Sequence, residues 1–276
     1  MVSSPLRDEM FAANRAAGHI ALAVAAGSGG TRRSQVHEAG SLRVRFPHGN
    51  SRILDAVIIN TAGGMAGGDR FDIDIKVRAG AKLSVTTAAA EKIYRSLGPD
   101  TEIDVKLDVG PGGTLAWLPQ ETILFDRARL RRNIDVELAA DASLLFAEAG
   151  IFGRSAMGEA MVSGRYFDRW RVHVGGSLAF VEAVRLDSGI AQRLAERAIA
   201  AGGAAVATVL KIPGRDDDVA AVRALQQYFS GEVGASSWNG LTLVRCVSSH
   251  GAPLRHDLTK VLTALGSEPL PRLWLN

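Results

Sequence analysis

The feature that most constrains the fold is an internal repeat in the middle of the chain. Each copy is a strand of alternating apolar and polar residues, a turn of small residues and a second strand. Three copies cover residues 72–87, 102–119 and 133–148, and a looser fourth covers residues 170–182. The copies recur roughly every 30–35 residues, a period typical of stacked repeats in which each unit buries a strand face against its neighbours. The repeat predicts a mainly β, stacked, β-helix-like architecture; an antiparallel sandwich stays open, because alternation alone fits both.

Two carboxylates fall on the predicted core face of this repeat. When the copies are aligned on a leucine of the second strand, Glu148 and Glu182 come four residues later, and side chains at i, i+2 and i+4 share one strand face. A carboxylate on a core face is costly unless it is paired or hydrated. Two interpretations follow: a structural ion pair with the nearby Arg154 or Arg185, or a water-filled passage through the stack. The aligned positions are Leu83, Leu115, Leu144 and Leu178, then Val85, Trp117, Phe146 and Phe180, then Thr87, Pro119, Glu148 and Glu182.

The segments around the repeat add strands and about two helices in the C-terminal third. Acidic residues suit a helix N-terminus, so Asp216 is predicted to begin an amphipathic helix, and a second helix is expected near residues 254–265, ending at Gly266. The chain then closes on Pro269–Trp274, an apolar tail that either docks on its own core or binds a partner. Residues 1–17 are predicted to be a flexible tail. Strands are predicted at 18–25, 41–46, 53–59, 204–212 and 240–247, with the polar stretch 27–35 between the first two.

A glycine-rich stretch, residues 60–69, leads into the first repeat. Its glycines are Gly63, Gly64, Gly67 and Gly68, and glycine permits tight turns and close backbone approach. A phosphate-binding loop would need a lysine after the glycines, and this stretch has none. A tight structural connection is predicted, and an ordinary glycine-rich hairpin loop would look the same.

Composition limits the class of protein. The 276 residues carry a net charge of only +3, far from the basic density of a nucleic-acid binder. The single cysteine, Cys246, excludes an internal disulfide framework and is typical of a cytoplasmic protein. No apolar run in the sequence has the length of a membrane-spanning helix.

Motifs for catalysis or tight metal binding are missing from the sequence. The histidines are scattered without H-x-H or H-x-x-x-H spacing, so no preformed metal site is predicted; a surface site that takes one histidine from each of two chains stays open. No G-x-S-x-G nucleophile motif occurs. A β-helical enzyme with Asp72 and Asp74 as paired acids is disfavoured, since both residues fit the solvent face of a strand. Motifs alone favour a protein that is not an enzyme.

The segment that connects the second and third repeats, residues 120–132, carries four arginines: Arg127, Arg129, Arg131 and Arg132. Charge runs of this kind are usually solvated, and at a sheet edge they block edge-to-edge association. The functional alternative is a rim that attracts an acidic partner and raises its association rate.

Five motifs, in order, carry a resemblance to a known family. Together they resemble the urease accessory protein UreD (UreH) family over residues from about Gly18 to Asn276, and any one of them alone would be weak. The motifs are NTAGGMAGGD at 60–69, TTAAAEKIYRS at 86–96, WLPQETILFD at 117–126, GRSAMGE at 153–159 and PRLW at 271–274.

The resemblance implies a fold, a role and partners. It implies one UreD-like domain, residues 18–276, folded as a right-handed β-helical stack with two late helices. The role implied is that of a non-catalytic, cytoplasmic chaperone for nickel insertion into apo-urease, with no tightly bound cofactor and only transient Ni²⁺. The partners implied are UreF, bound mainly through the C-terminal part, the GTPase UreG, recruited by UreF, and apo-urease. No nucleic acid or membrane is expected.

The resemblance also implies which residues serve an internal nickel channel. By motif, the channel-lining positions fall on Asp69, Thr86, Thr87, Glu148 and Glu182, and Arg272 and Trp274 fall in the partner-binding tail. Many relatives carry glutamine after the threonine pair, whereas this chain has Ala88, which removes a polar group there. The alternative is a scaffold that holds UreF and UreG on urease without handling nickel.

Overall fold

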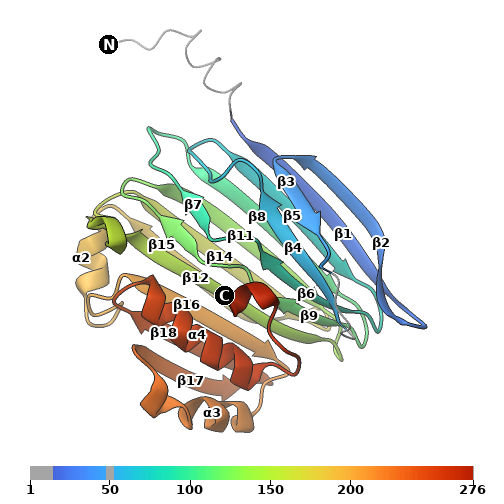
Figure 1. The fold of residues 1–276 in the computed structure, drawn as a ribbon. Coiled ribbons are helices and arrows are strands. Elements are labelled where there is room, and N and C mark those ends of the chain that lie inside the picture. Colours follow the sequence, from blue (N-terminus) through green and yellow to red (C-terminus); the bar gives the residue numbers. More distant parts are fainter. Residues whose placement is uncertain (1–14, 48–52, 276) are drawn as a thin grey trace.

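Two β-sheets packed face to face form the body of the molecule (Figure 1). The computed structural model describes residues 15–47 and 53–275. Most of the predicted flexible tail lies outside the described residues. Its last residues are held, since Arg15 Nη1 donates to the Gly67 carbonyl at 3.0 Å and the first strand begins at Ala17.

The first sheet has seven strands with a parallel centre. Strands β1, β5, β8, β11 and β14 run parallel in that spatial order, while the edge strands β2 and β15 pair antiparallel with β1 and β14. The inner strands alternate buried and exposed side chains, so one face of the sheet is in the core and the other in solvent. The bounds are β1 (Ala17–Gly27), β2 (Gly30–Gly40), β5 (Arg70–Val77), β8 (Thr101–Val109), β11 (Arg129–Leu138), β14 (Arg165–Val174) and β15 (Ser177–Asp187).

The second sheet follows the order β17-β18-β16-β12-β9-β6-β4-β3. Its β4, β6, β9 and β12 are parallel, and three short strands join it beside this path, with β10 pairing both β7 and β12. The bounds are β3 (Leu42–Arg45), β4 (Leu54–Asn60), β6 (Lys82–Thr87), β7 (Glu91–Ile93), β9 (Thr114–Trp117), β10 (Thr122–Leu124), β12 (Ser143–Arg154), β13 (Glu159–Ala160), β16 (Ala205–Ile212), β17 (Glu232–Trp238) and β18 (Leu241–Ser248).

The three strong repeats form successive turns of a coil, which confirms the predicted stacked architecture. In each copy the first strand lies in the first sheet and the second strand in the second sheet. The predicted alignment is the observed register, because Leu83 pairs with Leu115 and Leu115 pairs with Leu144. Their side chains therefore stack on the inner face of the second sheet.

The fourth copy departs from this pattern, and its prediction as another turn of the stack is wrong. Strand β15 returns to the first sheet and pairs antiparallel with β14. The physical reason is the turn: Gly175 and Gly176 have φ values of 58° and 80°, and two consecutive positive φ angles are typical of a two-residue hairpin. Leu178, predicted on the core face, is 56% exposed, because an irregularity in the register follows Val172.

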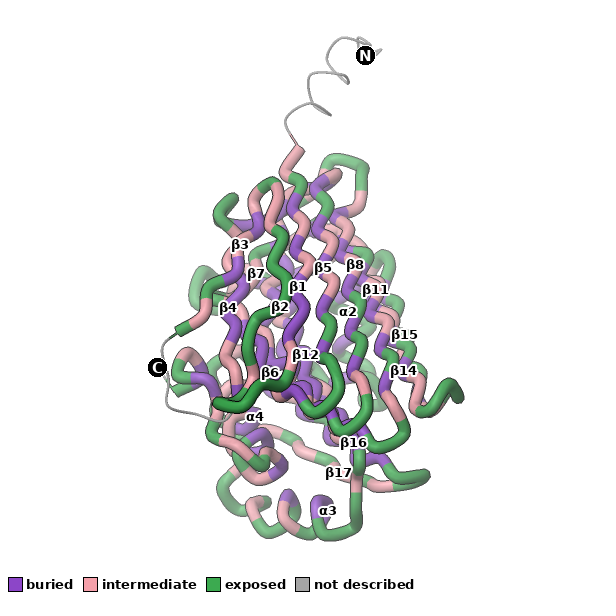
Figure 2. The backbone as a smooth tube through the Cα atoms, turned by 90° about the vertical axis from the view of Figure 1, so that its right-hand side faces the viewer, coloured by how far each residue is buried: buried purple, intermediate pink, exposed green. Residues whose placement is uncertain are grey.

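Three further elements, β2, β17 and the helix after β15, differ from the predictions. The polar stretch 27–35 contributes to β2, which is exposed along nearly all of its length and so shows no alternation (Figure 2). Strand β17 and the six-residue helix α2 (Ile190–Ala195) also lie outside the predicted elements. Both are short and mostly exposed, so neither presents a clear apolar period.

Apolar side chains fill two layers. One lies between the two sheets, where nearly all strands contribute, and the other lies between the second sheet and helix α4 (Gly251–Leu265) (Figure 1). Helix α3 (Asp216–Arg223) packs beside α4 and β17. Both predicted late helices are thereby confirmed, including the end of α4 at Gly266. The other helical turns within residues 15–47 and 53–275 are η1 (Ser155–Met157), η2 (Gln226–Tyr228) and η3 (Arg272–Trp274).

The C-terminal tail docks on its own chain. The Trp274 side chain is 2% exposed, and its indole Nε1 donates to the Leu118 carbonyl at 2.9 Å. The Arg255 guanidinium lies 5.0 Å from the Trp274 ring and donates to the Leu273 carbonyl at 2.9 Å. Of the two predicted uses of the tail, the structure shows the first.

Trp274→Ala should therefore destabilise the isolated chain. Loss of a buried tryptophan is expected to lower the free energy of unfolding by about 3–5 kcal/mol. Trp238→Ala is the matched control: Trp238 is 40% exposed, and its loss should change stability by about 0.5 kcal/mol or less. Guanidinium unfolding curves measure both, and equal midpoints for the two variants would contradict the docked tail.

Candidate functional site

A cavity of about 320 Å³ lies between the two sheets. Exposed residues of the loop around Ala88 and Lys92 border one end of it, and the buried side chains of Arg132 and Glu148 border the other. We call it the inter-sheet cavity. Its walls are Leu42, Ile58, Ile59, Asn60, Gly63, Phe71, Ile73, Thr87, Ala88, Ala89, Ala90, Glu91, Lys92, Ile103, Val105, Trp117, Pro119, Gln120, Thr122, Arg132 and Glu148.

Three charged side chains meet at the buried end of the cavity. Arg132 comes from β11, Asp168 from the neighbouring β14, and Glu148 from β12 in the opposite sheet. They are only 4%, 2% and 5% exposed. Arg132 donates two hydrogen bonds to Asp168, from Nε to Oδ1 at 2.9 Å and from Nη2 to Oδ2 at 2.5 Å. Its Nη1 donates to Glu148 Oε2. We call these three residues the buried charge cluster.

Aromatic side chains complete the hydrogen bonding of this cluster. The Trp117 indole donates to Glu148 Oε1 at 2.9 Å. The Tyr166 hydroxyl and the Trp170 indole donate to the two oxygens of Asp168, both at 2.9 Å. Both carboxylates thus accept at least two hydrogen bonds, which offsets the cost of removing them from water.

Burial and the attraction between opposite charges have opposite effects on the pKa values of Glu148 and Arg132. Burial raises the pKa of Glu148 to about 6, although Arg132 acts to lower it. For Arg132, burial alone would lower the pKa, but the carboxylates of Asp168 and Glu148 hold it well above its usual value. One positive and two negative groups leave the cluster with one negative charge when all are ionised. A group of this charge beside a cavity favours cations over anions.

A second carboxylate, that of Glu91, also lines the cavity. The Asn60 amide donates to both carboxylate oxygens of Glu91, at 3.0 and 3.2 Å. Burial raises the pKa of Glu91 to about 7, against the lowering effect of the Asn60 hydrogen bond. The cavity wall therefore holds two carboxylates, those of Glu91 and Glu148, together with the Thr87 hydroxyl.

Two of the five predicted channel residues, Thr87 and Glu148, line this cavity. Thr86 is adjacent to Thr87 on β6 and so points to the opposite face of the sheet, where its hydroxyl meets the Gln120 side chain at 3.4 Å. The Gln120 oxygen in turn accepts from Arg255 of α4 at 2.5 Å. Thr86 thus belongs to the helix side of the second sheet.

The other two predicted channel residues have structural partners away from the cavity. Asp69 accepts from the backbone N–H groups of Ala16 and Ala66, at 2.8 and 2.7 Å, and so fastens the glycine-rich loop. Glu182 projects from β15 and pairs with Arg245 of β18 at 2.5 Å, forming a second ion pair between the sheets. The structure therefore shows ion pairs for Glu148 and Glu182, but with Arg132 and Arg245 rather than the predicted Arg154 or Arg185.

The glycine-rich loop is tightly packed against the segment after β7. A Cβ atom added to Gly67 would lie 2.1 Å from Ser96 Oγ and 2.6 Å from the Pro99 carbonyl oxygen. At Gly64 it would meet the Tyr94 ring, and at Gly68 the Arg15 side chain. At Gly63, which lines the cavity, there is open space and a φ of 78°. The tight connection predicted for these glycines is present.

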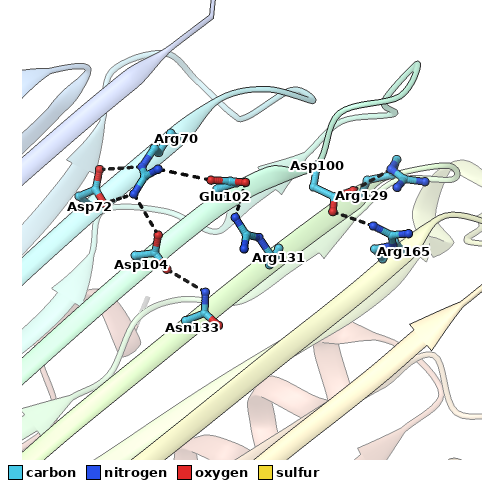
Figure 3. Close-up of polar contacts among 9 residues, drawn as sticks. All are labelled: Arg70, Asp72, Asp100, Glu102, Asp104, Arg129, Arg131, Asn133 and Arg165. Carbon is cyan, nitrogen blue, oxygen red and sulfur yellow. Dashed lines mark hydrogen bonds and ion pairs between the residues drawn. The ribbon is translucent and has the colours of Figure 1, made fainter.

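Three of the four clustered arginines lie away from the interior. On the outer face of the first sheet, Arg129 pairs with Asp100 at 2.8 Å and Arg131 pairs with Glu102, in two separate groups of polar contacts (Figure 3). Arg127 pairs with Asp126 at 3.6 Å. Arg132, in contrast, points inward, so its prediction as part of a solvated edge or rim is wrong. The group around Arg131 also holds Arg70, Asp72, Asp104 and Asn133, and the group around Arg129 also holds Arg165.

The described residues contain no group of three or more His, Cys, Asp or Glu side chains that could hold a metal ion together. The buried thiol of Cys246 has its pKa raised by burial to about 12. It therefore stays protonated and does not act as a thiolate ligand. The inter-sheet cavity therefore offers oxygen atoms as metal ligands.

Several residues of the site were missed from the sequence. Arg132 follows Leu130 and precedes Ile134 at steps of two, and Asp168 stands in the same way between Tyr166 and Trp170. Each of these charged residues takes a position that the alternation of its strand assigns to the buried face, and this pattern could have identified both. Asn60, Glu91, Gln120 and Thr122 lie in the recognised motifs, but nothing in their spacing marks them as wall residues.

Fold and site together define a stacked β protein whose interior holds a cavity lined by two carboxylates. The family model described as "UreD urease accessory protein" matches residues 16–275. The chain belongs to the UreD urease accessory protein family, whose members are helpers of urease rather than enzymes. The resemblance seen in the motifs is thereby confirmed.

Curated relatives agree along nearly the full chain. A urease accessory protein UreD of Rhodopseudomonas palustris (strain ATCC BAA-98 / CGA009) is 54% identical over 268 residues, which cover 97% of this chain and 96% of that protein. One of Bradyrhizobium diazoefficiens is 51% identical over 267 residues, with 97% and 96% covered. A role in urease maturation follows from this membership. Among the described residues, no helix has the length and apolarity needed to span a membrane.

Glu91 should make the stability of the chain depend on pH. Because its folded pKa is raised to about 7 from an ordinary value of 4.5, its favourable contribution is complete below pH 4.5 and is lost as the pH rises through 7. Glu91→Gln should flatten this part of the stability profile between pH 5 and pH 8. Guanidinium unfolding at several pH values tests this, with the exposed Glu232→Gln as control. A Glu91→Gln profile parallel to that of wild type would contradict the assignment.

Proposed function

We propose that this protein is a urease maturation chaperone that binds apo-urease together with UreF and UreG and supports nickel insertion. In this proposal, Ni²⁺ is cargo that passes through the inter-sheet cavity. The observation that carries it is the buried carboxylate of Glu148 in the wall of a cavity that Glu91 also lines.

The chemistry of the walls supports transient passage. Nickel accepts oxygen as well as nitrogen ligands, while thiolates bind soft metals more strongly. The cavity offers the oxygens of Asn60, Thr87, Glu91 and Glu148 without a thiolate. A conduit needs several weak sites, so that the ion can both enter and leave.

The tail region supports the proposed contact with UreF only in part. Trp274 is buried in its own chain, so a direct contact through its side chain would require the tail to undock. Arg272 and Leu275 are exposed beside it and are the better candidates for contact with UreF. A cytoplasmic location stays a prediction, based on the single cysteine.

A scaffold without nickel handling is the second candidate. Its supporting observation is that Glu148 and Glu182 both have arginine partners, as purely structural carboxylates do. In that case nickel would reach urease by a route outside this protein, and both carboxylates would matter only for stability.

Glu148→Gln should separate the two candidates. Gln keeps the size of the side chain and an acceptor for Trp117 but removes the charge. We expect the complex with UreF to copurify and the nickel content of activated urease to fall roughly tenfold, the scale of losing a supporting group at a metal site. The nickel content of urease after activation in vitro measures this.

Glu182→Gln is the matched control, because Glu182 also forms an inter-sheet ion pair but does not line the cavity. It should leave nickel loading near the wild-type level. Normal loading with Glu148→Gln in an intact complex would favour the scaffold. An equal loss in both variants would place the route elsewhere.

A further inference from the structure

On the basis of the function proposed above, we propose that Arg132 is a resident cation that closes the inner end of the inter-sheet cavity. Its Nη1 occupies Glu148 Oε2, the position that an entering divalent cation would take. A cation therefore reaches Glu148 only when this arm of the guanidinium leaves.

The two sides of the Arg132 guanidinium have different partners: one side is held by Asp168, and the other, Nη1, reaches Glu148. Nε and Nη2 both donate to Asp168, an arrangement in which two parallel hydrogen bonds fix the plane of the group. Nη1 alone reaches Glu148, with a longer contact to the Thr122 hydroxyl at 3.4 Å. Release of Glu148 therefore costs one charged hydrogen bond, while Arg132 stays paired with Asp168.

The position of the cavity agrees with this division. Arg132 and Glu148 are in its walls, whereas Asp168, Tyr166 and Trp170 are not. The exchangeable contact thus faces the space from which a cation would come, and the anchored contact lies behind it. Asp168 acts here as a positioning residue, because it sets where the Arg132 charge stands.

The charge balance gives the sharpest test. In the wild type, one positive and two negative groups leave one negative charge. The double variant Arg132→Gln/Asp168→Asn also leaves one, on Glu148 alone. The two proteins therefore differ in whether Arg132 is paired with Glu148, and they do not differ in the net charge that attracts the ion.

Titration of the full-length chains with NiCl₂ by calorimetry measures the difference. The double variant should bind Ni²⁺ roughly tenfold to a hundredfold more tightly than wild type, the effect of freeing one charge-assisted hydrogen bond. Adding Glu148→Gln should abolish the gain. Trp117, which donates to Glu148, reports the location, so its fluorescence should be quenched by Ni²⁺ in the double variant. Equal affinities for wild type and a folded double variant would overturn the proposal.

Asp168→Asn alone keeps the proposal testable if the double variant does not fold. Arg132 then has Glu148 as its only carboxylate in the cluster, so Ni²⁺ should bind more weakly than to wild type. Equal or tighter binding would overturn the role of Arg132.

The urease assay separates this proposal from the function on which it rests. Lost loading with Glu148→Gln but unchanged Ni²⁺ affinity in the double variant refutes only the role of Arg132. Normal loading with Glu148→Gln refutes the nickel route itself, whatever the affinities are.

Discussion

The contact between Arg132 and Glu148 is the interaction on which the interior depends. It places a charge from the first sheet against a charge from the second, inside a layer that is otherwise mostly apolar. Buried charges are tolerated only when paired and hydrogen-bonded, so β11, β12 and β14 must keep the register that brings Arg132, Glu148 and Asp168 together. A slip of one residue would turn each of these charges to the other face of its sheet. The cluster thus specifies register as well as local electrostatics.

The stacked coil explains why a cavity exists beside this cluster. Parallel strands repeat the same inward positions from one turn to the next, and large side chains fill them up to Val85, Trp117 and Phe146. Beyond β6 the chain continues with three alanines, residues 88–90, which line the cavity and of which Ala88 and Ala89 are exposed. The polar groups of the cavity come mostly from strands and strand ends, among them Asn60, Thr87, Glu91 and Glu148.

The alternating pattern predicted the architecture well, because it records directly which side of a strand is buried. The aligned leucines of three repeats are neighbours in the sheet, and Glu148 faces the interior as expected. The pattern failed where a turn decided the outcome: Gly175-Gly176 sends β15 back into the first sheet, and alternation does not specify which sheet a strand joins. For the site, spacing located Thr87 and Glu148 but not Arg132, because the arginine run around it resembled a solvated surface. The partners of Asp69 and Glu182 depend on distant segments, which a single sequence does not bring together.

Membership of the UreD family assigns the chain to urease maturation, and the interior suggests how it contributes. A direct test of passage is to block the cavity chemically. The native Cys246 is buried and its thiol stays protonated, so an introduced Ala89→Cys at the exposed end can be labelled selectively with a bulky maleimide. Ser34→Cys on the exposed strand β2, labelled in the same way, is the control. The measurement is the nickel content of urease activated by each labelled complex. The account predicts loss of nickel only with label at residue 89, and normal nickel content with that label in place would contradict it.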